Sequence, residues 1–341
     1  MTTLAPPTTP PRLGPRTRWG RAASLVGRRV LLAAPITTLV SLLVFWLASI
    51  APFNPLAAYL GPRFERASME ERAALAEQLG IDDSWLTIWW HWASDVVLHW
   101  DWGYSRTLAR PVSEALAERL PWTLLLAATG IVLGVLISLV LGVSAARRPG
   151  SLVDRLAAGL AHVVQAVPPF VLALGSIAVF SLALRWLPVA GVSRGGADPT
   201  WGSIAVHLVL PGLVLALSQV PWLLLNVRTS VLTALTEDHV TAARARGLPV
   251  RTVVWRHALP GALLPFVTVI GARLPELVTG AVIVETVFGW PGIASATVDA
   301  AVSGDFPLLA AVTVLSCLFV LLGSMVADAL YLLIDPRVHD A

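Results

Sequence analysis

Long apolar stretches alternate with shorter polar segments along most of the chain. A helix that crosses the hydrocarbon core of a bilayer needs about 20 mostly apolar residues. Six stretches are long enough, at residues 30–51, 121–146, 156–184, 203–227, 258–288 and 307–334. The fifth contains Arg273, Glu276 and Glu285, and the last contains Asp328. The pattern therefore predicts an all-α integral membrane protein with six transmembrane helices.

The arginines predict which side of the membrane each loop occupies. Cytoplasmic loops carry an excess of basic residues. Fifteen arginines lie before the first span, after the second, after the fourth and after the last, whereas only Arg185 and Arg194 lie in the opposing short loops. The long 52–119 segment is left out, because long segments cross largely regardless of charge. Both the N and C termini are therefore expected on the cytoplasmic side.

These spans divide the chain into five regions. We expect a cytoplasmic N-terminal tail at 1–29, the first transmembrane helix at 30–51, an extracytoplasmic segment with short helices at 52–119, a five-helix core at 120–334 and a cytoplasmic tail at 335–341. The first 18 residues are rich in proline and polar residues, which is typical of a disordered tail. The apolar part of the first span is too long for a cleaved signal peptide.

The extracytoplasmic segment contains two recognisable patterns. Ser68 and Glu71 have the spacing of a capping box and Gly80 can end a helix, so the sequence predicts a helix at about 69–79. Six of the 14 tryptophans then fall within residues 84–105. Tryptophan at this density favours an interfacial helix and loop at the lipid headgroups. An aromatic platform for a substrate is the alternative.

Composition excludes several classes of chemistry. Hydrophobic residues make up 56% of the chain and charged residues 13%, and the mean hydropathy is +0.74. All 24 basic residues are arginine, so Schiff-base chemistry and a lysine-containing phosphate-binding loop are absent. The single cysteine, Cys317, excludes an internal disulfide or a cysteine-rich metal site. We therefore expect this chain to have no catalytic residues, no metal and no cofactor. We also expect no nucleic-acid partner, because arginines placed on one side of a membrane explain the pI of about 9.7.

The segment between the fourth and fifth spans carries the most specific pattern. Glu237 and Asp238 lie where a helix dipole favours acids, and Gly247 follows Arg246 where a helix can end. An apolar face remains along the segment, made by Val240, Ala243, Leu248, Val250, Val253 and Val254. The sequence predicts a helix, a tight turn and a second amphipathic piece. This unit could lie on the membrane surface, but Pro249 and the glycine turn favour a knob that inserts into a protein partner.

The same segment resembles the "EAA" loop of binding-protein-dependent ABC importer permeases. Ala242 and Ala243 take the alanine positions, Gly247 the glycine and Leu259-Pro260 the closing pair, although Thr241 and His257 differ from the usual residues. The oligopeptide and dipeptide subfamily is similar over more of the chain. Its landmarks are matched at Gly103–Ser105, from Arg110 ("RPVSEALAERLP"), from Val284 ("VETVFGWPGI") and from Asp328 ("DALYLLIDPRV").

The resemblance implies a type I ABC importer permease fold in the cell (inner, cytoplasmic) membrane. It implies a transport subunit rather than an enzyme, working with a second homologous permease, an extracytoplasmic substrate-binding protein and two ABC ATPase subunits that hold ATP and magnesium. Short peptides would be the substrate. The 235–260 loop would be the coupling loop that contacts the ATPase, through Glu237, Asp238, Ala242, Ala243, Arg244, Arg246, Gly247 and Arg251.

Charged and polar residues inside the spans are candidates for the translocation path. Arg273 and Glu276 are three residues apart, which places both on one face of a helix. They could line the path or form an internal ion pair. The uncharged candidates are Gln165, Gln219, Asn226 and His162, and a hydrogen bond in helix packing is the alternative for each. By the resemblance, Glu285 and Trp290 are candidates for contact with the binding protein, and a solvated span end is the alternative.

Other functions are compatible with parts of this pattern. The same machinery could import nickel, glutathione or another small solute. An ion-coupled secondary carrier would show two repeat halves rather than one cytoplasmic knob. An intramembrane enzyme is disfavoured, because no His/Cys/Asp cluster has ligand spacing.

Overall fold

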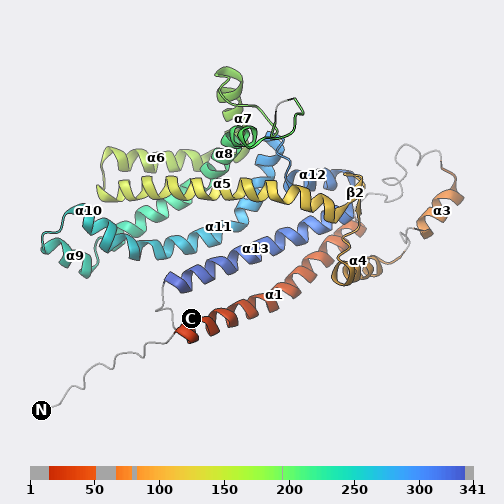
Figure 1. The fold of residues 1–341 in the computed structure, drawn as a ribbon, viewed down its shortest axis with the longest axis horizontal. Helices are drawn as coiled ribbons and strands as arrows, with labels where there is room; N and C mark the ends of the chain where they lie inside the picture. Colours follow the sequence, from red (N-terminus) through yellow and green to blue (C-terminus); the bar gives the residue numbers. More distant parts are fainter. Residues whose placement is uncertain (1–14, 51–66, 79–82, 194, 335–341) are drawn as a thin grey trace, which may run out of the picture.

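A computed structural model describes residues 15–50, 67–78, 83–193 and 195–334. Five long helices form a bundle (Figure 1): α1 (Pro15–Ile50), α5 (Val112–Arg147), α8 (Trp201–Ala234), α11 (Leu259–Phe288) and α13 (Phe306–Ile334). Helix α5 packs along α8, α8 along α11, α11 along α13 and α13 along α1. The predicted fold class, a membrane protein built mostly of helices, is confirmed.

Four of the described helices are individually long and apolar enough to cross a membrane. These segments are Ala33–Ile50, Val112–Arg147, Trp201–Ala234 and Phe306–Met325. Three further pairs of shorter helices pass the same test together but are bent at a break, which raises the possible total to seven. The described chain is therefore a multi-pass membrane protein. The predicted number of six spans lies within this range and stays a prediction.

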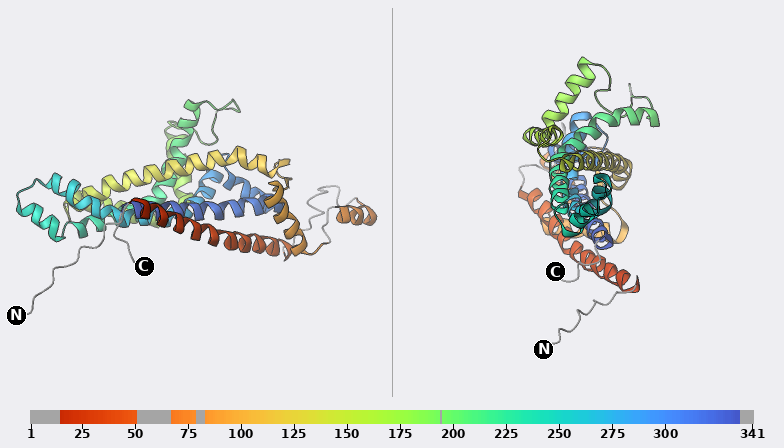
Figure 2. Two further views of the ribbon diagram at one scale, coloured as in Figure 1. Left: turned by 60° about the horizontal axis from the view of Figure 1, so that its bottom comes forward. Right: turned by 90° about the vertical axis from the view of Figure 1, so that its left-hand side faces the viewer.

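The stretch at 156–184, predicted as one span, is broken in the middle. Helix α6 (Leu152–Ala166) is followed by α7 (Pro169–Ser176), which continues into the π-helix η2 (Ile177–Ala183), and the axis bends by 102° at the break. Pro168 and Pro169 lack a backbone N–H, and a residue before proline avoids the helical conformation. Val167 is accordingly extended, with φ −96° and ψ 121°. Helices α7 and η2 project from the bundle (Figures 1 and 2).

The first helix begins earlier than predicted. Helix α1 starts at Pro15, so residues 15–29 are helical rather than part of a tail. Proline is favourable at the first position of a helix, because the N–H that it lacks has no helical partner there. The arginines, alanines and leucine that follow are good helix formers. The rest of the predicted tail, residues 1–14, lies outside the described residues.

Short elements lie toward one end of the bundle (Figure 1). The predicted capping box is confirmed at the start of α3 (Met69–Gln78), where the Ser68 N–H donates to Glu71 Oε2 at 2.9 Å and the Glu71 N–H donates to Ser68 Oγ at 3.1 Å. Gly80 lies outside the described residues. Helix α4 (Trp85–His99) contacts α1, where Trp89 Nε1 donates to Ser41 Oγ at 3.0 Å. Helix α12 (Ile293–Ser303) lies at the same end (Figure 1).

A two-stranded antiparallel hairpin, β1 (Tyr104–Ser105) and β2 (Arg110–Pro111), lies at this end of the bundle and is bonded to Asp305. Ser105 Oγ donates to the buried carboxylate of Asp305 at 2.7 Å, and the Thr107 N–H donates to the same oxygen at 2.9 Å. Asp305 lies in the turn between α12 and α13. The hairpin is therefore attached to the turn that precedes the last span.

Small residues let α5 and α8 approach closely. A Cβ atom at Gly130 would lie 2.7 Å from Leu215, and one at Gly142 would lie 2.8 Å from Val227. Gly130, Gly134 and Gly142 are separated by four and eight residues, which places them on one face of α5, and small residues at this spacing allow close contact between membrane helices. This contact is the centre of the bundle and holds α8 in place.

The opposite end of the bundle carries the loop between the fourth and fifth predicted spans. It contains α9 (Asp238–Ala245), α10 (Val250–Thr252) and the π-helix η3 (Val253–Ala258) (Figure 1). The start of α1 and the end of α13 both point toward this end (Figure 2). Which side of the membrane this end faces stays a prediction.

Candidate functional site

The 235–260 loop folds into the predicted helix, tight turn and second helical piece. Glu237 is the last residue before α9, and Asp238 lies in its first turn. Gly247 follows the helix with φ +76°, and its N–H donates to the carbonyl oxygen of Arg244 at 2.9 Å. Glycine adopts this left-handed conformation without steric cost. The predicted role of Gly247 in ending the helix is confirmed.

The inner face of the loop packs into the bundle. Val240 and Ala243 are completely buried, and Val253 and Val254 of η3 are nearly so. They join one apolar cluster with residues of α5, α8 and α11, among them Val231 and Ala234 of α8. Two residues of the predicted apolar face are not buried. Leu248, beyond the end of α9, is 36% exposed, and Val250, at the start of α10, is 62% exposed.

The outer face of α9 is exposed and charged. Among the eight residues predicted to contact an ATPase, seven are exposed, namely Glu237, Asp238, Ala242, Arg244, Arg246, Gly247 and Arg251. Ala243 is the exception. It lies three residues after Val240 on the inward face of the helix, so its side chain packs in the core and cannot touch a partner. The loop is thus an exposed knob with a firmly packed base.

His239 connects the two helical pieces of this knob. Its Nδ1 lies 3.2 Å from Glu237 Oε2, and its Nε2 lies 3.1 Å from the carbonyl oxygen of His257, which is a hydrogen bond when Nε2 carries the proton. An open pocket beside it is lined by Thr233, Thr236, Glu237, Asp238 and His239. The start of α9 is therefore held against η3 by a side chain as well as by apolar packing.

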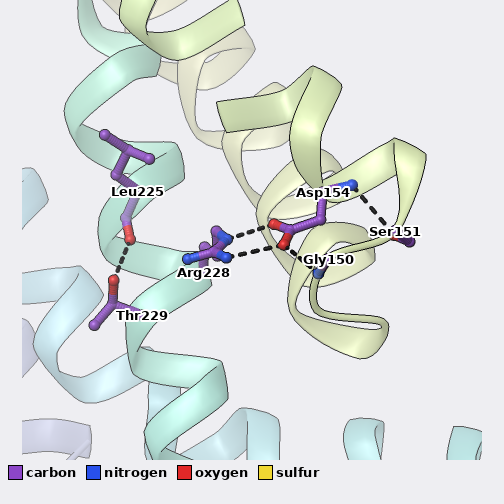
Figure 3. Close-up of polar contacts among 6 residues, drawn as sticks. All are labelled: Gly150, Ser151, Asp154, Leu225, Arg228 and Thr229. Carbon is purple, nitrogen blue, oxygen red and sulfur yellow. Dashed lines mark hydrogen bonds and ion pairs between the residues drawn. The ribbon is translucent and has the colours of Figure 1, made fainter. Parts of the chain in front are cut away.

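An ion pair that the sequence did not predict lies near the same end of the bundle (Figure 3). Arg228 of α8 donates from Nε to Asp154 Oδ1 at 2.5 Å and from Nη2 to Oδ2 at 2.9 Å. Oδ2 also accepts the N–H of Gly150 at 2.8 Å, and Ser151 caps α6 by accepting the Asp154 N–H at 3.3 Å. The Ser151-Asp154 spacing predicts a helix start but does not reveal the arginine, which is 74 residues away.

The candidates for the translocation path do not form one cluster. The guanidinium of Arg273 stacks over the ring of Trp222 at 4.2 Å from its centroid, which is a cation–π contact between α11 and α8. The side chain of Glu276 lies outside the described part of the structure. Gln219 and Asn226 lie two turns apart on α8, whereas Gln165 is exposed on α6.

The two candidates on α8, Gln219 and Asn226, each have a buried side-chain amide oxygen. Within the described residues, Gln219 Oε1 and Asn226 Oδ1 are buried without a hydrogen-bond partner, as is Ser138 Oγ on α5. Buried polar atoms are normally satisfied by protein or by ordered water. These atoms are therefore places where a water molecule or a ligand group could donate a hydrogen bond.

Glu285 and Trp290 are buried, which argues against the predicted contact with an external protein. Both side chains are exposed by 1% or less. Glu285 accepts hydrogen bonds from Thr123 Oγ1 at 2.6 Å and from the Ser295 N–H at 3.0 Å, and Trp290 Nε1 donates to the carbonyl oxygen of Trp122 at 2.9 Å. These contacts turn both side chains inward, where they fix the sharp turn between α11 and α12 against α5.

Among the described residues, no three His, Cys, Asp or Glu side chains are placed to hold a metal ion together.

Comparison with known proteins gives two consistent results. Residues 138–340 match the family model described as "Binding-protein-dependent transport system inner membrane component". The oligopeptide transport system permease protein AppB of Bacillus subtilis is 34% identical over 318 residues, covering 93% of this chain and 99% of that protein. The glutathione transport system permease protein GsiC of Salmonella typhimurium is 33% identical over 312 residues, covering 92% of this chain and 97% of that protein.

Proposed function

Because this chain belongs to the family of binding-protein-dependent transport system inner membrane components, the permease subunits of ABC importers, we propose that it imports short peptides with energy supplied by separate ATPase subunits. The exposed, charged α9 knob is the observation that carries this proposal. Its base is packed into the α5, α8 and α11 cluster, so a force applied to the knob is passed directly to the spans.

The charges on the knob suit docking into a cleft of an ATPase subunit. Glu237 and Asp238 lie at one end of α9, and Arg244 and Arg246 lie at the other. Complementary charges of both signs favour one orientation of docking. The absence of lysine from the chain fits an arrangement in which ATP and magnesium are bound by the partner.

The transport step itself is a movement of helices rather than a reaction on this chain. Closure of two ATPase subunits on ATP would draw together the knobs of this chain and of a second, homologous permease, and the spans would switch between inward and outward access. The transporter would lie in the cell membrane, and an extracytoplasmic binding protein would deliver the substrate to it. We propose the path along the face of α8 that carries Gln219, Trp222 and Asn226, with Arg273 of α11 beside Trp222.

Peptide is the proposed substrate, and glutathione is the second candidate. The first relative above is named for oligopeptide transport and the other for glutathione transport, at nearly equal identity. Glutathione is itself a tripeptide-like molecule with two carboxylates and one amine, so a path that accepts peptide termini suits both.

Reconstitution of the assembled transporter tests this function. The permease, its partner permease, the ATPase subunits and the binding protein are placed in proteoliposomes, and uptake of labelled peptides and of labelled glutathione is measured with and without ATP. We expect ATP-dependent uptake of peptides. Uptake that needs no ATPase would overturn the ATP-driven mechanism, and uptake of glutathione alone would overturn the choice of substrate.

The coupling role of the knob is tested by Gly247→Asp. The new side chain lies on the exposed turn in open space, with nothing within 4 Å, and it blocks close approach of an ATPase. It also adds backbone strain, because Gly247 has φ +76°, so the control must carry the same strain. Gly196→Asp is the matched control, because Gly196 has φ +77° and equally open surroundings in the 184–200 loop. We expect uptake to fall about tenfold or more only for Gly247→Asp. Equal uptake by the two variants would contradict the coupling role.

A further inference from the structure

The contact between α6 and α8, at the end of the bundle that carries α9, has two parts. Along the helices, Ala157 and Ala161 of α6 form an apolar cluster with Val220 and Leu224 of α8. Beyond that cluster, Asp154 of α6 and Arg228 of α8 form an ion pair (Figure 3). Apolar packing has no preferred direction, whereas a bidentate ion pair restricts both the distance and the orientation of the two helices.

The pair has the geometry of a rigid connection. Both oxygens of Asp154 accept from the guanidinium fork, and Oδ2 is held in addition by the Gly150 N–H. The side chain of Asp154 is exposed by only 6% and that of Arg228 by 27%. Bidentate pairs of arginine and carboxylate restrict orientation as well as distance. Arg155 lies next to Asp154 and contributes a further positive charge, but its side chain is exposed.

The location of Arg228 connects this pair to the knob. Arg228 lies six residues before Ala234, the last residue of α8, and α9 begins at Asp238. Between them, Val231 and Ala234 pack in the same cluster as Val240 and Ala243 of α9. A displacement of α9 therefore moves the last two turns of α8, and Arg228 with them.

The far end of α6 is where such a movement would have its effect. Helix α6 ends at the Val167–Pro168 break, beyond which α7 departs at 102°. Rotation or translation of α6 as one body moves the start of α7. A break with two missing backbone donors is the point where the helix axis can change direction without disrupting a hydrogen bond.

We propose that Asp154 and Arg228 are positioning residues that transmit displacement of the α9 knob to α6 and the α7 arm. This inference rests on the proposed function, since it assumes that α9 receives the force. The pair is present for register rather than for stability. Replacement of a buried ion pair by well-packed apolar residues is often neutral or stabilising, whereas removal of one partner leaves a buried charge.

The decisive variant is therefore the double replacement Asp154→Leu/Arg228→Met, which removes both charges and keeps apolar volume. Arg228→Lys is the second variant, because lysine keeps the charge but cannot form the bidentate fork. Arg155→Gln is the control, because it changes an exposed charge next to the pair. Each variant is assembled into the complete transporter. Three quantities are measured: assembly with the ATPase, stimulated ATP hydrolysis, and substrate imported per ATP hydrolysed.

We expect the double variant to assemble and hydrolyse ATP while importing about tenfold less substrate per ATP, in the range of typical coupling energies. Arg228→Lys should fall between the double variant and the wild type, and Arg155→Gln should behave as wild type. A wild-type import ratio in the double variant would overturn the inference. So would loss of assembly in both pair variants, because the pair would then be needed only for structure.

These outcomes are distinguishable from failure of the proposed function. If the unaltered transporter shows no ATP-dependent uptake, the function itself is wrong. If it imports substrate and Gly247→Asp uncouples it, while the double variant imports normally, the knob is the coupling site but Asp154 and Arg228 do not transmit its movement.

Discussion

The backbone of Gly292 lies directly against the carboxylate of Glu285, so that a side-chain carbon at position 292 would collide with the carboxylate atoms. The same carboxylate accepts hydrogen bonds from Thr123 of α5 and from Ser295 of α12. Three helices thus meet at one buried acid, at the turn where α11 and α12 bend by 84°.

Gly292→Ala is expected to destabilise the protein. The added methyl group forces the Glu285 carboxylate away from its donors, and overpacking of this kind costs about 1–3 kcal/mol. Thermal unfolding of the purified protein in detergent measures the effect. Gly261→Ala on α11 is the control, because a Cβ at Gly261 would meet nothing within 4 Å. Equal melting temperatures for the two variants would show that the carboxylate is not confined as described.

Gly142→Ala is expected to weaken the contact between α5 and α8. Its Cβ would lie 2.8 Å from Val227 Cγ1 and 3.0 Å from the carbonyl oxygen of Leu224, and the backbone atom cannot turn away. We expect a loss of about 1–3 kcal/mol, although alanine favours helix formation. In Gly159→Ala on α6 the new atom meets nothing within 4 Å, so this control should gain up to about 1 kcal/mol. In detergent, the melting temperature should fall for Gly142→Ala and rise for Gly159→Ala.

Arg273→Gln tests whether Arg273 contacts the substrate. If the guanidinium over Trp222 binds a peptide carboxylate, its loss should reduce uptake of peptides with a free C terminus by roughly tenfold, the value of one charge-assisted hydrogen bond. Uptake of the same peptides with an amidated C terminus should change little. Trp222→Phe keeps an aromatic face and should have a smaller effect.

The alternative for Arg273 predicts a different result. If Arg273 and Glu276 only pair with each other, then Arg273→Gln and Glu276→Gln should each impair assembly, and the double replacement should restore both assembly and uptake for both kinds of peptide. Normal uptake by the double variant would therefore exclude both residues from the path.

Features that depend on neighbours in the chain were predictable from the sequence. The capping box at Ser68 and Glu71 and the helix end at Gly247 are set by spacing and by local backbone preference, so both could be predicted without the fold. The apolar stretches likewise determine that the chain enters a membrane, because an apolar segment of that length has no better environment. The resemblance of the 235–260 loop to a known family was equally a property of the residues alone.

Features that depend on distant segments were decided only by the tertiary structure. The sequence left Glu285 as a contact with a partner or as a solvated span end, and it offered Trp290 as a contact as well, but packing against α5 buries both side chains. It offered no reason to join Asp154 with Arg228. It placed Ala243 both on the apolar face of the loop and among the residues expected to contact the ATPase, and only the packing of α9 decided that Ala243 is buried. Hydrophobic and charge patterns indicate which side chains avoid water and which need it. They do not indicate which residue takes the place of water around a side chain that becomes buried. That partner is chosen when helices far apart in the sequence pack together.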